Sequence, residues 1–517
     1  MRIGVPRETR AGERLVAATP QTVGQLHKLG YEVVVESGAG AGASFPDGAY
    51  AEAGATVVDA GTAWSSDVVA TVTVPPEESL PALGLRPGAV LIGMMAPAAR
   101  PGLLGALSAA DVTGLALDAV PRISRAQSLD VLSTLSNVAG YRAVIEAAEE
   151  YGGMFTGQVT AAGKTAPAEV FVIGAGVAGL AAIGAAVSLG ARVRAYDVRP
   201  EVAEQIESMG AQFVRAEVPG AASGPSADGY ADALTAEQEA AVARMYAQET
   251  ARADVVITTA LVRGTAPTTI TSAMVAAMRP GSVVVDLAAS GGGNCERTVP
   301  GERVVTENGV VVLGWTDLTS RMPRHTSQLF GTNVVNLLAL LTPEKDGEPV
   351  LDLTDPVQRG MTVAHEGQVL WPPPPVQVSA APATTPAAPQ AAPAVDPRAA
   401  ARRRTRSTVL AGLGAVLVTL ALSFAPPDLH GHVMVLALAV VAGYYVISNV
   451  THALHTPLMA QTNAVSGIIL VGALLQLGSD NLLVTILAFV AATVASINIF
   501  GGFLVAHRMI SMFRKDG

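Results

Sequence analysis

Short apolar runs alternate with longer alanine-rich stretches from the N-terminus to about residue 371. The runs are apolar at successive positions, which is typical of strands whose two faces are both buried. Strands of this kind separated by helices predict parallel βαβ construction. The expected strands are 33–36, 68–74, 89–93, 170–173, 192–196, 255–258, 282–286 and 310–313, and a helical run is expected at 235–252. The series is too long for one sheet, so we predict an α/β fold of two Rossmann-like lobes with parallel sheets and a cleft between them.

The hydrophobic pattern changes near the C-terminus. Between Ser407 and Val505 there is no Lys or Arg, and the only carboxylates are Asp428 and Asp480. Each apolar run in this region is close to the ~20 residues that a helix needs to cross hydrocarbon. Basic residues flank only the two outer ends, which the positive-inside rule places in the cytosol. We therefore predict a membrane domain at 402–517 with four transmembrane helices, at about 408–424, 433–450, 458–477 and 482–505.

The segment 372–401 is mostly Pro and Ala. Such a composition cannot build a core and favours extended polyproline II, so we expect a semi-rigid linker between the α/β part and the membrane helices. The N-terminus has no apolar run of signal-peptide length, so we expect the α/β part to stay in the cytosol.

Composition and charge exclude several classes of function. Charged residues make up 15% of the chain, and the formal net charge is −10. An acidic balance argues against a nucleic-acid surface, because phosphate contacts need clustered Lys and Arg. The single cysteine, Cys295, excludes an intramolecular disulfide framework and any multi-cysteine metal or cluster site, so we assign no metal.

A glycine-rich turn follows the expected strand 170–173. Gly174, Gly176 and Gly179 stand in G-x-G-x-x-G order. The first glycine permits a tight turn, the second lets backbone approach a pyrophosphate, and the third allows close packing of helix on strand. The following helix offers free N–H groups and a positive dipole end to the phosphates. In a chain with 52 glycines the motif alone is weak evidence.

Asp197 strengthens this interpretation. It ends the expected strand 192–196, near the spacing of ~20 residues after the glycine turn at which a carboxylate binds the adenosine ribose hydroxyls. A carboxylate here favours NAD over NADP, whereas Arg199 nearby argues the other way. A Rossmann-like lobe with an empty site is the alternative. The candidate cofactor-binding residues are Gly174, Ala175, Gly176, Val177, Ala178, Gly179, Asp197, Val198, Arg199, Thr259 and Ala260.

Several motifs resemble a known family. Residues 1–8, 13–14 and 18–20 resemble the start of alanine dehydrogenases and of nicotinamide nucleotide transhydrogenase α subunits. Residues 121–133 and 138–141 are similar to the transhydrogenase branch, and residues 451–468 resemble the membrane domain of its α subunit. The likeness covers nearly the whole chain except the Pro/Ala-rich linker.

The resemblance implies the NAD(H)-binding subunit of a proton-translocating NAD(P) transhydrogenase. Hydride would pass directly between NADH on this chain and NADP+ on a partner β subunit, coupled to proton translocation. The implied setting is multi-pass in the lipid bilayer of the bacterial cytoplasmic membrane, as a dimer of αβ units. The implied domains are a first lobe at 1–135 completed by 320–371, an NAD(H)-binding Rossmann lobe at 136–319, the linker 372–401 and the membrane domain 402–517.

The resemblance also implies roles for residues of one loop. Arg122 would bind nucleotide and partner, Gln127 would bridge to the partner's nucleotide, and Asp130 and Ser133 would orient the nicotinamide carboxamide. This agrees with elementary chemistry, because hydride transfer needs two nicotinamide rings held in contact rather than an acid or base. A carboxamide needs one acceptor and one donor. Tyr230 would lie in a mobile loop that covers the adenosine.

One departure weighs against amino-acid oxidation. Alanine dehydrogenases use a Lys and a His on pyruvate, and the corresponding stretches 72–76 and 91–97 contain neither. Two alternatives stay open: a membrane-tethered NAD-binding regulator without catalysis and an anchored amino-acid dehydrogenase. The dinucleotide fingerprint occurs once, so the NADP(H) site must come from another chain. His452 and His455 are expected near a helix turn, in capping or interface roles, and no proton-conducting residue is assigned.

Overall fold

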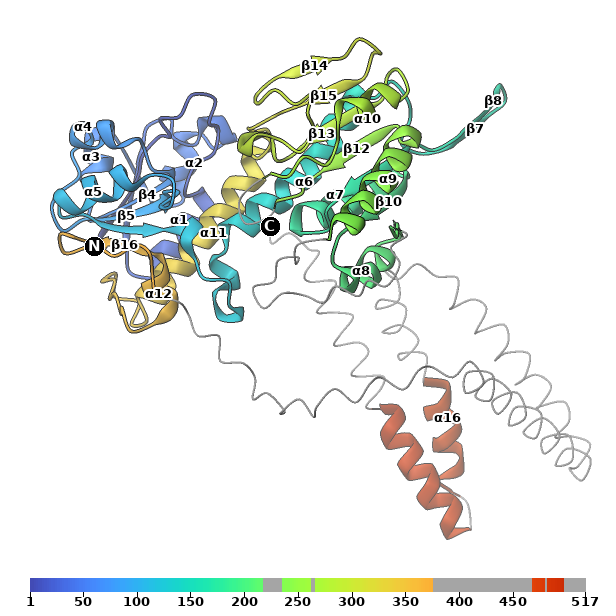
Figure 1. Cartoon of the computed structure of the whole chain (residues 1–517). Helices are drawn as coiled ribbons and strands as arrows, with labels where there is room; N and C mark the ends of the chain where they lie inside the picture. Colours follow the sequence, from blue (N-terminus) through green and yellow to red (C-terminus); the bar gives the residue numbers. More distant parts are fainter. Residues whose placement is uncertain (217–234, 262–265, 375–466, 479–480, 497–517) are drawn as a thin grey trace, which may run out of the picture. The chain divides into compact units, whose positions relative to one another are not determined.

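The computed structural model describes residues 1–216, 235–261, 266–374, 467–478 and 481–496. The chain divides into two compact units, residues 1–379 and residues 380–517. The first unit contains two lobes, each built on its own sheet (Figure 1).

The first lobe is built on an eight-stranded sheet in the order β17-β16-β6-β5-β4-β1-β2-β3. Its strands are β1 (Arg2–Val5), β2 (Glu32–Glu36), β3 (Thr56–Val58), β4 (Val68–Thr73), β5 (Val90–Met94), β6 (Thr113–Ala116), β16 (Thr362–His365) and β17 (Gln368–Val369). Strands β1 to β6 are parallel to one another and follow the 3-2-1-4-5-6 order of a Rossmann sheet. Strand β16 pairs antiparallel with β6, so a late segment of the chain returns to complete this sheet.

The second lobe is built on a seven-stranded sheet in the order β11-β10-β9-β12-β13-β15-β14. Its strands are β9 (Glu169–Ile173), β10 (Arg192–Tyr196), β11 (Gln212–Phe213), β12 (Val255–Thr258), β13 (Val283–Asp286), β14 (Arg303–Val305) and β15 (Val311–Leu313). All pair in parallel except β14, so this sheet also has the Rossmann order. A separate hairpin of β7 (Gln158–Thr160) and β8 (Gly163–Thr165) stands away from the lobe (Figure 1).

Helices cover both faces of each sheet, as strands buried on two faces require. The first lobe carries α1 (Pro20–Lys28), α2 (Asp47–Glu52), α3 (Ala60–Trp64), α4 (Leu80–Leu83), α5 (Pro101–Ala109), α11 (Pro323–Leu341) and α12 (Pro356–Met361). The second carries α7 (Val177–Ser188), α8 (Ala203–Ser208), α9 (Ala236–Arg252) and α10 (Ser272–Ala277). Helices α6 and α7 pack on one face of the second sheet, and α9 and α10 on the other.

Helix α6 (Val131–Glu150) belongs to both lobes. Val131 at its start is buried in the first-lobe core, whereas Ala143, Val144 and Ala147 are buried in the second-lobe core. Midway along the helix, a Cβ atom added to Gly140 would come within 2.0 Å of the Ala178 carbonyl oxygen. The absence of a side chain at this position therefore lets α6 lie directly against the start of α7.

The chain passes between the lobes twice, along α6 and in the segment just before α11. Charged side chains join these two passages. Glu146, buried on α6, accepts hydrogen bonds from Arg142 (2.7 Å) and from Arg321 (3.1 Å), which lies just before α11. The Arg321 guanidinium also lies 4.0 Å from the centre of the Trp315 ring. Nearby, the Ser320 hydroxyl donates to Glu13 at 2.5 Å. The segment just before α11 is thus fixed to α6 and to the N-terminal loop.

The second unit is described only in part. It shows α16 (Gly467–Gln476) and a helix over 482–496, both inside predicted membrane spans. Large apolar side chains are exposed on both, including Leu475 and Leu482. No helix in the described part of the chain combines the length and the apolar character needed to cross a bilayer. The predicted spans 408–424 and 433–450 and nearly all of the linker 372–401 lie outside the described residues.

The sequence-based prediction of two Rossmann-like lobes with parallel sheets is confirmed. Each predicted strand coincides with an observed one to within about one residue at either end, and the predicted helix 235–252 is α9. Helix α9 begins at a capping box, in which Thr235 and Gln238 each accept a backbone N–H of the other.

Replacing Gly140 with Ala is expected to force α6 and α7 apart. Because the added Cβ would clash with the Ala178 backbone, we expect a loss of about 1–3 kcal/mol in the free energy of unfolding. Gly105 in α5 is the matched control: its Cβ would meet nothing within 4 Å, so Gly105→Ala should stabilise by about 0.5–1 kcal/mol. Thermal unfolding of the two purified variants measures both effects, and equal melting temperatures would contradict the close contact.

Glu8 generates a prediction about pH. Its carboxylate accepts the Val72 and Thr73 amides at the carboxyl end of β4 (2.6 and 3.2 Å). Burial raises the pKa of Glu8 from 4.5 to about 7, against the lowering effect of these hydrogen bonds. The folded protein therefore keeps a proton that the unfolded chain loses. The stability associated with Glu8 is complete below pH 4.5, declines as the pH rises, and is lost above about 7.

Replacing Glu8 with Gln, which imitates the protonated carboxyl, is expected to stabilise the protein at pH 8 relative to pH 5, each compared with wild type. The measurement is the midpoint of thermal unfolding at both pH values. Glu78→Gln, a change at an exposed carboxylate, is the control and should show the wild-type dependence. A Glu8→Gln profile parallel to that of wild type would show that burial does not raise the pKa of Glu8.

Candidate functional site

The glycine-rich turn lies where the strand order of the second sheet reverses. It follows β9, which has β10 on one side and β12 on the other. Ligands of open α/β sheets bind at this point, outside the carboxyl ends of the strands. Gly174 has a φ of +93°, a conformation that favours glycine, and its N–H donates to the Tyr196 carbonyl (2.8 Å). The turn is therefore fixed to the end of β10.

The residues after Gly174 begin helix α7. A Cβ on Gly179 would come within 1.8 Å of the Gly174 carbonyl, so helix and turn are in direct contact. Ala175 is buried, whereas Gly176 and Val177 are exposed and Ala178 is half-buried. The first N–H groups of a helix have no partner within the helix, so this exposed end offers donors and a positive dipole to an anion.

Asp197 is buried at the end of β10 and holds the turn. Its Oδ2 accepts the Ala175 amide at 2.7 Å. Its Oδ1 accepts both the backbone amide and the Nε of Arg199, at 2.9 and 3.0 Å. The hydrogen bond to Asp197 raises the pKa of Arg199. Both carboxylate oxygens are thus engaged in this structure, and the Arg199 charge is neutralised. Val198, between Asp197 and Arg199 in the sequence, is half-buried against the second-lobe core.

Thr259 and Ala260 follow β12 on the other side of the turn. The Thr259 amide and hydroxyl donate to the Ile173 carbonyl at 2.9 and 3.1 Å, so this residue braces the end of β9. The Ala260 carbonyl accepts from the side-chain amide of Asn294 at 2.8 Å. The same amide donates to the Pro267 carbonyl (2.7 Å), and its oxygen accepts from the Thr258 hydroxyl (2.9 Å). Asn294 is fully buried and fixes the segment that leaves β12.

The loop that resembles the transhydrogenase motif precedes α6. It contains a 3-10 helix over Ser124–Leu129, anchored by the buried side chains of Ala126 and Leu129. These two anchors leave Arg122 and Gln127 exposed. The alternation of buried and exposed positions explains how a short loop presents polar side chains outward.

Asp130 and Ser133 meet at the start of α6. Asp130 is the N-cap residue: its Oδ1 accepts the Ser133 amide at 2.9 Å, and its Oδ2 accepts the Ser133 hydroxyl at 2.6 Å. Helix α6 rises ~1.5 Å per residue, which separates this cap from Gly140, beside the glycine turn, by about 15 Å. The structure therefore brings together the turn, Asp197 and Thr259, and holds the loop residues at the far end of the same helix. Tyr230 lies outside the described residues.

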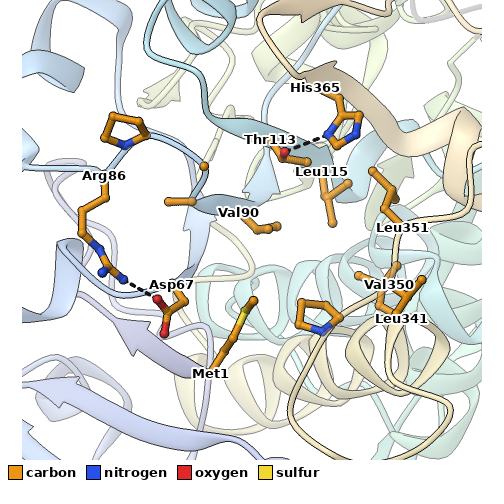
Figure 2. Close-up of a pocket in the computed structure, with 14 residues that line it drawn as sticks. Met1, Asp67, Arg86, Val90, Thr113, Leu115, Leu341, Val350, Leu351 and His365 are labelled. Carbon is orange, nitrogen blue, oxygen red and sulfur yellow. Dashed lines mark hydrogen bonds and ion pairs between the residues drawn. The ribbon is translucent and has the colours of Figure 1, made fainter.

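Two cavities lie in the first lobe, apart from the glycine turn. Figure 2 shows one of about 540 Å³ at the amino ends of the strands, beside Asp67, Val90 and Thr113. Thr113 is hydrogen-bonded there to His365 at 3.0 Å. This cavity lies at the edge opposite the one where open α/β sheets bind ligands. The other, about 520 Å³, is lined by residues 7–15 and part of 38–42, beside Glu8.

Within the described residues, no group of three His, Cys, Asp or Glu side chains could hold a metal ion. Cys295 is buried, and burial raises the pKa of its thiol to about 11.

Reasoning from sequence missed the asparagines that brace this region. Asn294 follows a run of glycines after β13, where a polar residue at a strand's carboxyl end was a detectable sign. Asn333 and Asn336 donate to the Ser128 carbonyl from α11, and two asparagines three residues apart in the mainly apolar stretch 330–341 were the corresponding sign.

Comparisons with known proteins cover almost all of the chain. The models of the alanine dehydrogenase/PNT N-terminal and C-terminal domains match residues 4–139 and 143–372. The model of the 4TM region of pyridine nucleotide transhydrogenase matches residues 432–515.

Relatives of full length are also found. The chain is 53% identical to NAD(P) transhydrogenase subunit alpha of Haemophilus influenzae and 49% identical to that of Cereibacter sphaeroides, over 100% of both chains in each case. A crystal structure of transhydrogenase from Sinorhizobium meliloti is 38% identical, with a TM-score of 0.65. The match covers 71% of this chain and 100% of that one. The chain therefore belongs to the alanine dehydrogenase/pyridine nucleotide transhydrogenase family and, within it, to the transhydrogenase alpha subunits.

Proposed function

We propose that this chain is the NAD(H)-binding subunit of a proton-translocating transhydrogenase. It carries NADH to a partner β subunit that binds NADP(H), and hydride passes directly from one nicotinamide C4 to the other. The products are NAD+ and NADPH, so the transfer itself releases no proton. Proton movement across the bilayer is coupled to this exchange through the membrane helices.

The observation that carries the proposal is the double attachment of α6. Its N-cap, Asp130 with Ser133, belongs to the loop that resembles the transhydrogenase motif. Its middle, at Gly140, contacts the glycine turn for the pyrophosphate. A dinucleotide bound with its phosphates at α7 and its nicotinamide toward Asp130 would be aligned along one rigid helix. Such alignment is what hydride transfer requires, because its rate depends on the approach and orientation of two rings.

The proposed contacts divide among the candidate residues. Gly174 to Gly179 receive the pyrophosphate, Asp197 and Val198 the adenosine ribose, and Thr259 and Ala260 line the wall beside β12. Asp130 accepts the carboxamide NH2. Ser133 donates to the carboxamide oxygen, which requires its hydroxyl to turn away from Asp130. Arg122 and Gln127, both exposed, face the partner's nucleotide, and Tyr230 covers the adenosine.

The match to a four-helix membrane region associates the chain with a membrane. We infer a multi-pass protein of the bacterial cytoplasmic membrane with its nucleotide-binding part in the cytosol, working as a dimer of αβ units. The proposed domains are the first lobe at 1–135 with 320–371, the NAD(H) lobe at 136–319, the linker 372–401 and the membrane domain 402–517.

Co-expression with a β subunit in sealed vesicles tests the proposal. Reduction of an NADP+ analogue by NADH is expected, and an imposed proton gradient should accelerate it. NADH binding without any transfer would refute the proposal and leave a membrane-tethered NAD-binding regulator.

Replacing Asp130 with Ala is expected to slow hydride transfer by on the order of tenfold or more while leaving most of the NADH affinity. The reason is that the carboxamide loses its acceptor while the phosphate and ribose contacts remain. Steady-state transfer rates and NADH titrations of the vesicles measure the two quantities.

Asp59→Ala is the matched control. Asp59 caps α3 with the same geometry, accepting the amide and the hydroxyl of Thr62 at 2.8 and 3.2 Å. Either substitution costs about 1 kcal/mol of stability through the lost cap. If both variants transfer hydride at the same rate, the assignment of Asp130 to the nicotinamide is wrong.

Asp197 and Arg199 predict a change of nucleotide preference. Asp197→Asn keeps an oxygen for the Ala175 amide but removes the charge that neutralises Arg199. We expect the Kd for NADH to rise by about tenfold, the effect of losing charge-assisted hydrogen bonds to ribose. The Kd for NADPH should fall, because the released guanidinium can pair with the 2′-phosphate.

Calorimetric titration with both nucleotides measures these affinities. Adding Arg199→Met to Asp197→Asn should abolish the gain in NADPH binding. An Asp197→Asn variant that binds NADPH no better than wild type would show that this pair does not contact the adenosine ribose.

A further inference from the structure

The carbonyl of Ser128 receives two side-chain hydrogen bonds from one helix. The amide nitrogens of Asn333 and Asn336, both on α11, lie 2.9 and 3.0 Å from this oxygen. Residues three apart lie on the same face of a helix, which explains how both side chains reach one acceptor. A carbonyl oxygen has two lone pairs, so both are engaged. The orientation of this peptide is therefore fixed by α11.

This peptide lies between Gln127 and Asp130, the two residues proposed to face the partner's nucleotide and the nicotinamide. The next residue, Leu129, is buried, and the Asp130 amide donates to the Gln127 carbonyl at 3.3 Å. A rotation of the Ser128 peptide would therefore move both functional side chains together. A fixed Ser128 peptide keeps the side chains of Gln127 and Asp130 at a constant distance from each other.

Asn333 is unfavourable for the stability of α11 itself. Between Phe330 and Leu341 this helix forms part of the first-lobe core. Asn333 is only 6% exposed, and its amide oxygen has no hydrogen-bond partner among the described residues. A buried polar atom without a partner costs free energy. An apolar residue would pack better at this position, and the distinctive contact that the amide makes is the one to Ser128.

We propose that Asn333 and Asn336 are positioning residues for hydride transfer. They hold the 122–130 loop so that Gln127 and Asp130 present the nicotinamide to the partner's nucleotide. This inference rests on the proposed function. Helix α11 begins at the crossing between the lobes, where Arg321 binds Glu146. The helix that binds the loop is therefore also fixed, at its start, to the junction with the second lobe.

The rest of the loop is held independently of the asparagines. Arg125 forms an ion pair with Asp355 just before α12. Although burial opposes it, the hydrogen bonds of Arg125 and of the Val357 amide lower the pKa of Asp355. Ala126 and Leu129 remain buried as anchors. Loss of one asparagine donor should therefore displace the Ser128 peptide without unfolding the loop.

The test uses Asn336→Asp in the full chain, co-expressed with a β subunit in membrane vesicles. The change is isosteric but places an acceptor oxygen against the Ser128 carbonyl. We expect the hydride-transfer rate to fall on the order of tenfold or more, because small misplacements of reacting groups have large effects on rate. The Kd for NADH should stay within about twofold. Thr332→Val is the control: it removes a hydrogen bond internal to α11, from the Thr332 hydroxyl to the Gln328 carbonyl (2.9 Å), and should leave the rate unchanged.

A double-mutant cycle with Gln127→Ala distinguishes positioning from general destabilisation. If Asn336 acts through the loop, the two substitutions together should slow transfer less than the product of their separate effects. Independent effects, an unchanged rate, or a proportional loss of NADH affinity and melting temperature would each overturn the inference.

Hydrogen exchange of the loop amides provides a measurement that does not depend on turnover. Exchange over 122–130 should rise in Asn336→Asp and not in Thr332→Val; no rise would overturn the positioning role even in a preparation without transfer activity. Conversely, a wild-type complex that transfers no hydride would refute the proposed function, whereas an active wild type with an equally active Asn336→Asp variant would refute this inference alone.

Discussion

The contact between α6 and α7 at Gly140 is the constraint on which the other features depend. Helix α6 is buried at its start in the first-lobe core and at its end in the second, so it cannot move with one lobe alone. The contact of Gly140 with the Ala178 backbone fixes where along α6 the glycine turn lies. The distance from this turn to the Asp130 cap is then set by helix geometry and not by loop conformation. A nucleotide that spans both ends, as proposed, is therefore held along one helix and not between two independently moving lobes.

The two sheets have the same strand order, yet within the described residues only the second carries the glycine turn that we propose for the phosphates. In the second lobe, the strand β9 ends in Gly174 and leads to the exposed start of α7. In the first, β1 ends in Val5 and leads to Glu8, whose carboxylate occupies the amides at the end of β4. Glu8 therefore occupies amide donors that a phosphate would otherwise use. In the proposed site, the first lobe therefore supplies the loop before α6, and the second supplies the glycine turn.

Much of the fold was predictable because most of its central strands are largely apolar on both faces. The strands β9, β10, β12 and β13 were expected almost to the residue. Short strands such as β3, and β16, which pairs with β6 from more than 200 residues away, carry no comparable local pattern and depend on tertiary pairing. The same reason applies to the site. The glycine turn and Asp197 are close in sequence and follow a fixed spacing, whereas Asn333 and Ser128 meet only after folding. That Asp197 pairs with Arg199 was likewise a matter of geometry, since the sequence shows both charges but not their contact.

The pairing of Asp197 has a consequence for the kinetics of nucleotide exchange. In the structure described, its carboxylate is already satisfied by the Ala175 amide and by Arg199. Binding of ribose at Asp197, as proposed, then exchanges hydrogen bonds with Arg199 for hydrogen bonds with the ribose hydroxyls, so the contacts that are lost offset part of the free energy that is gained. The same exchange favours release of the nucleotide, because the Arg199 guanidinium replaces the departing ribose hydroxyls at Asp197. A subunit that exchanges NAD+ for NADH in every cycle, as proposed, benefits from a carboxylate that has hydrogen-bond partners both with and without the nucleotide.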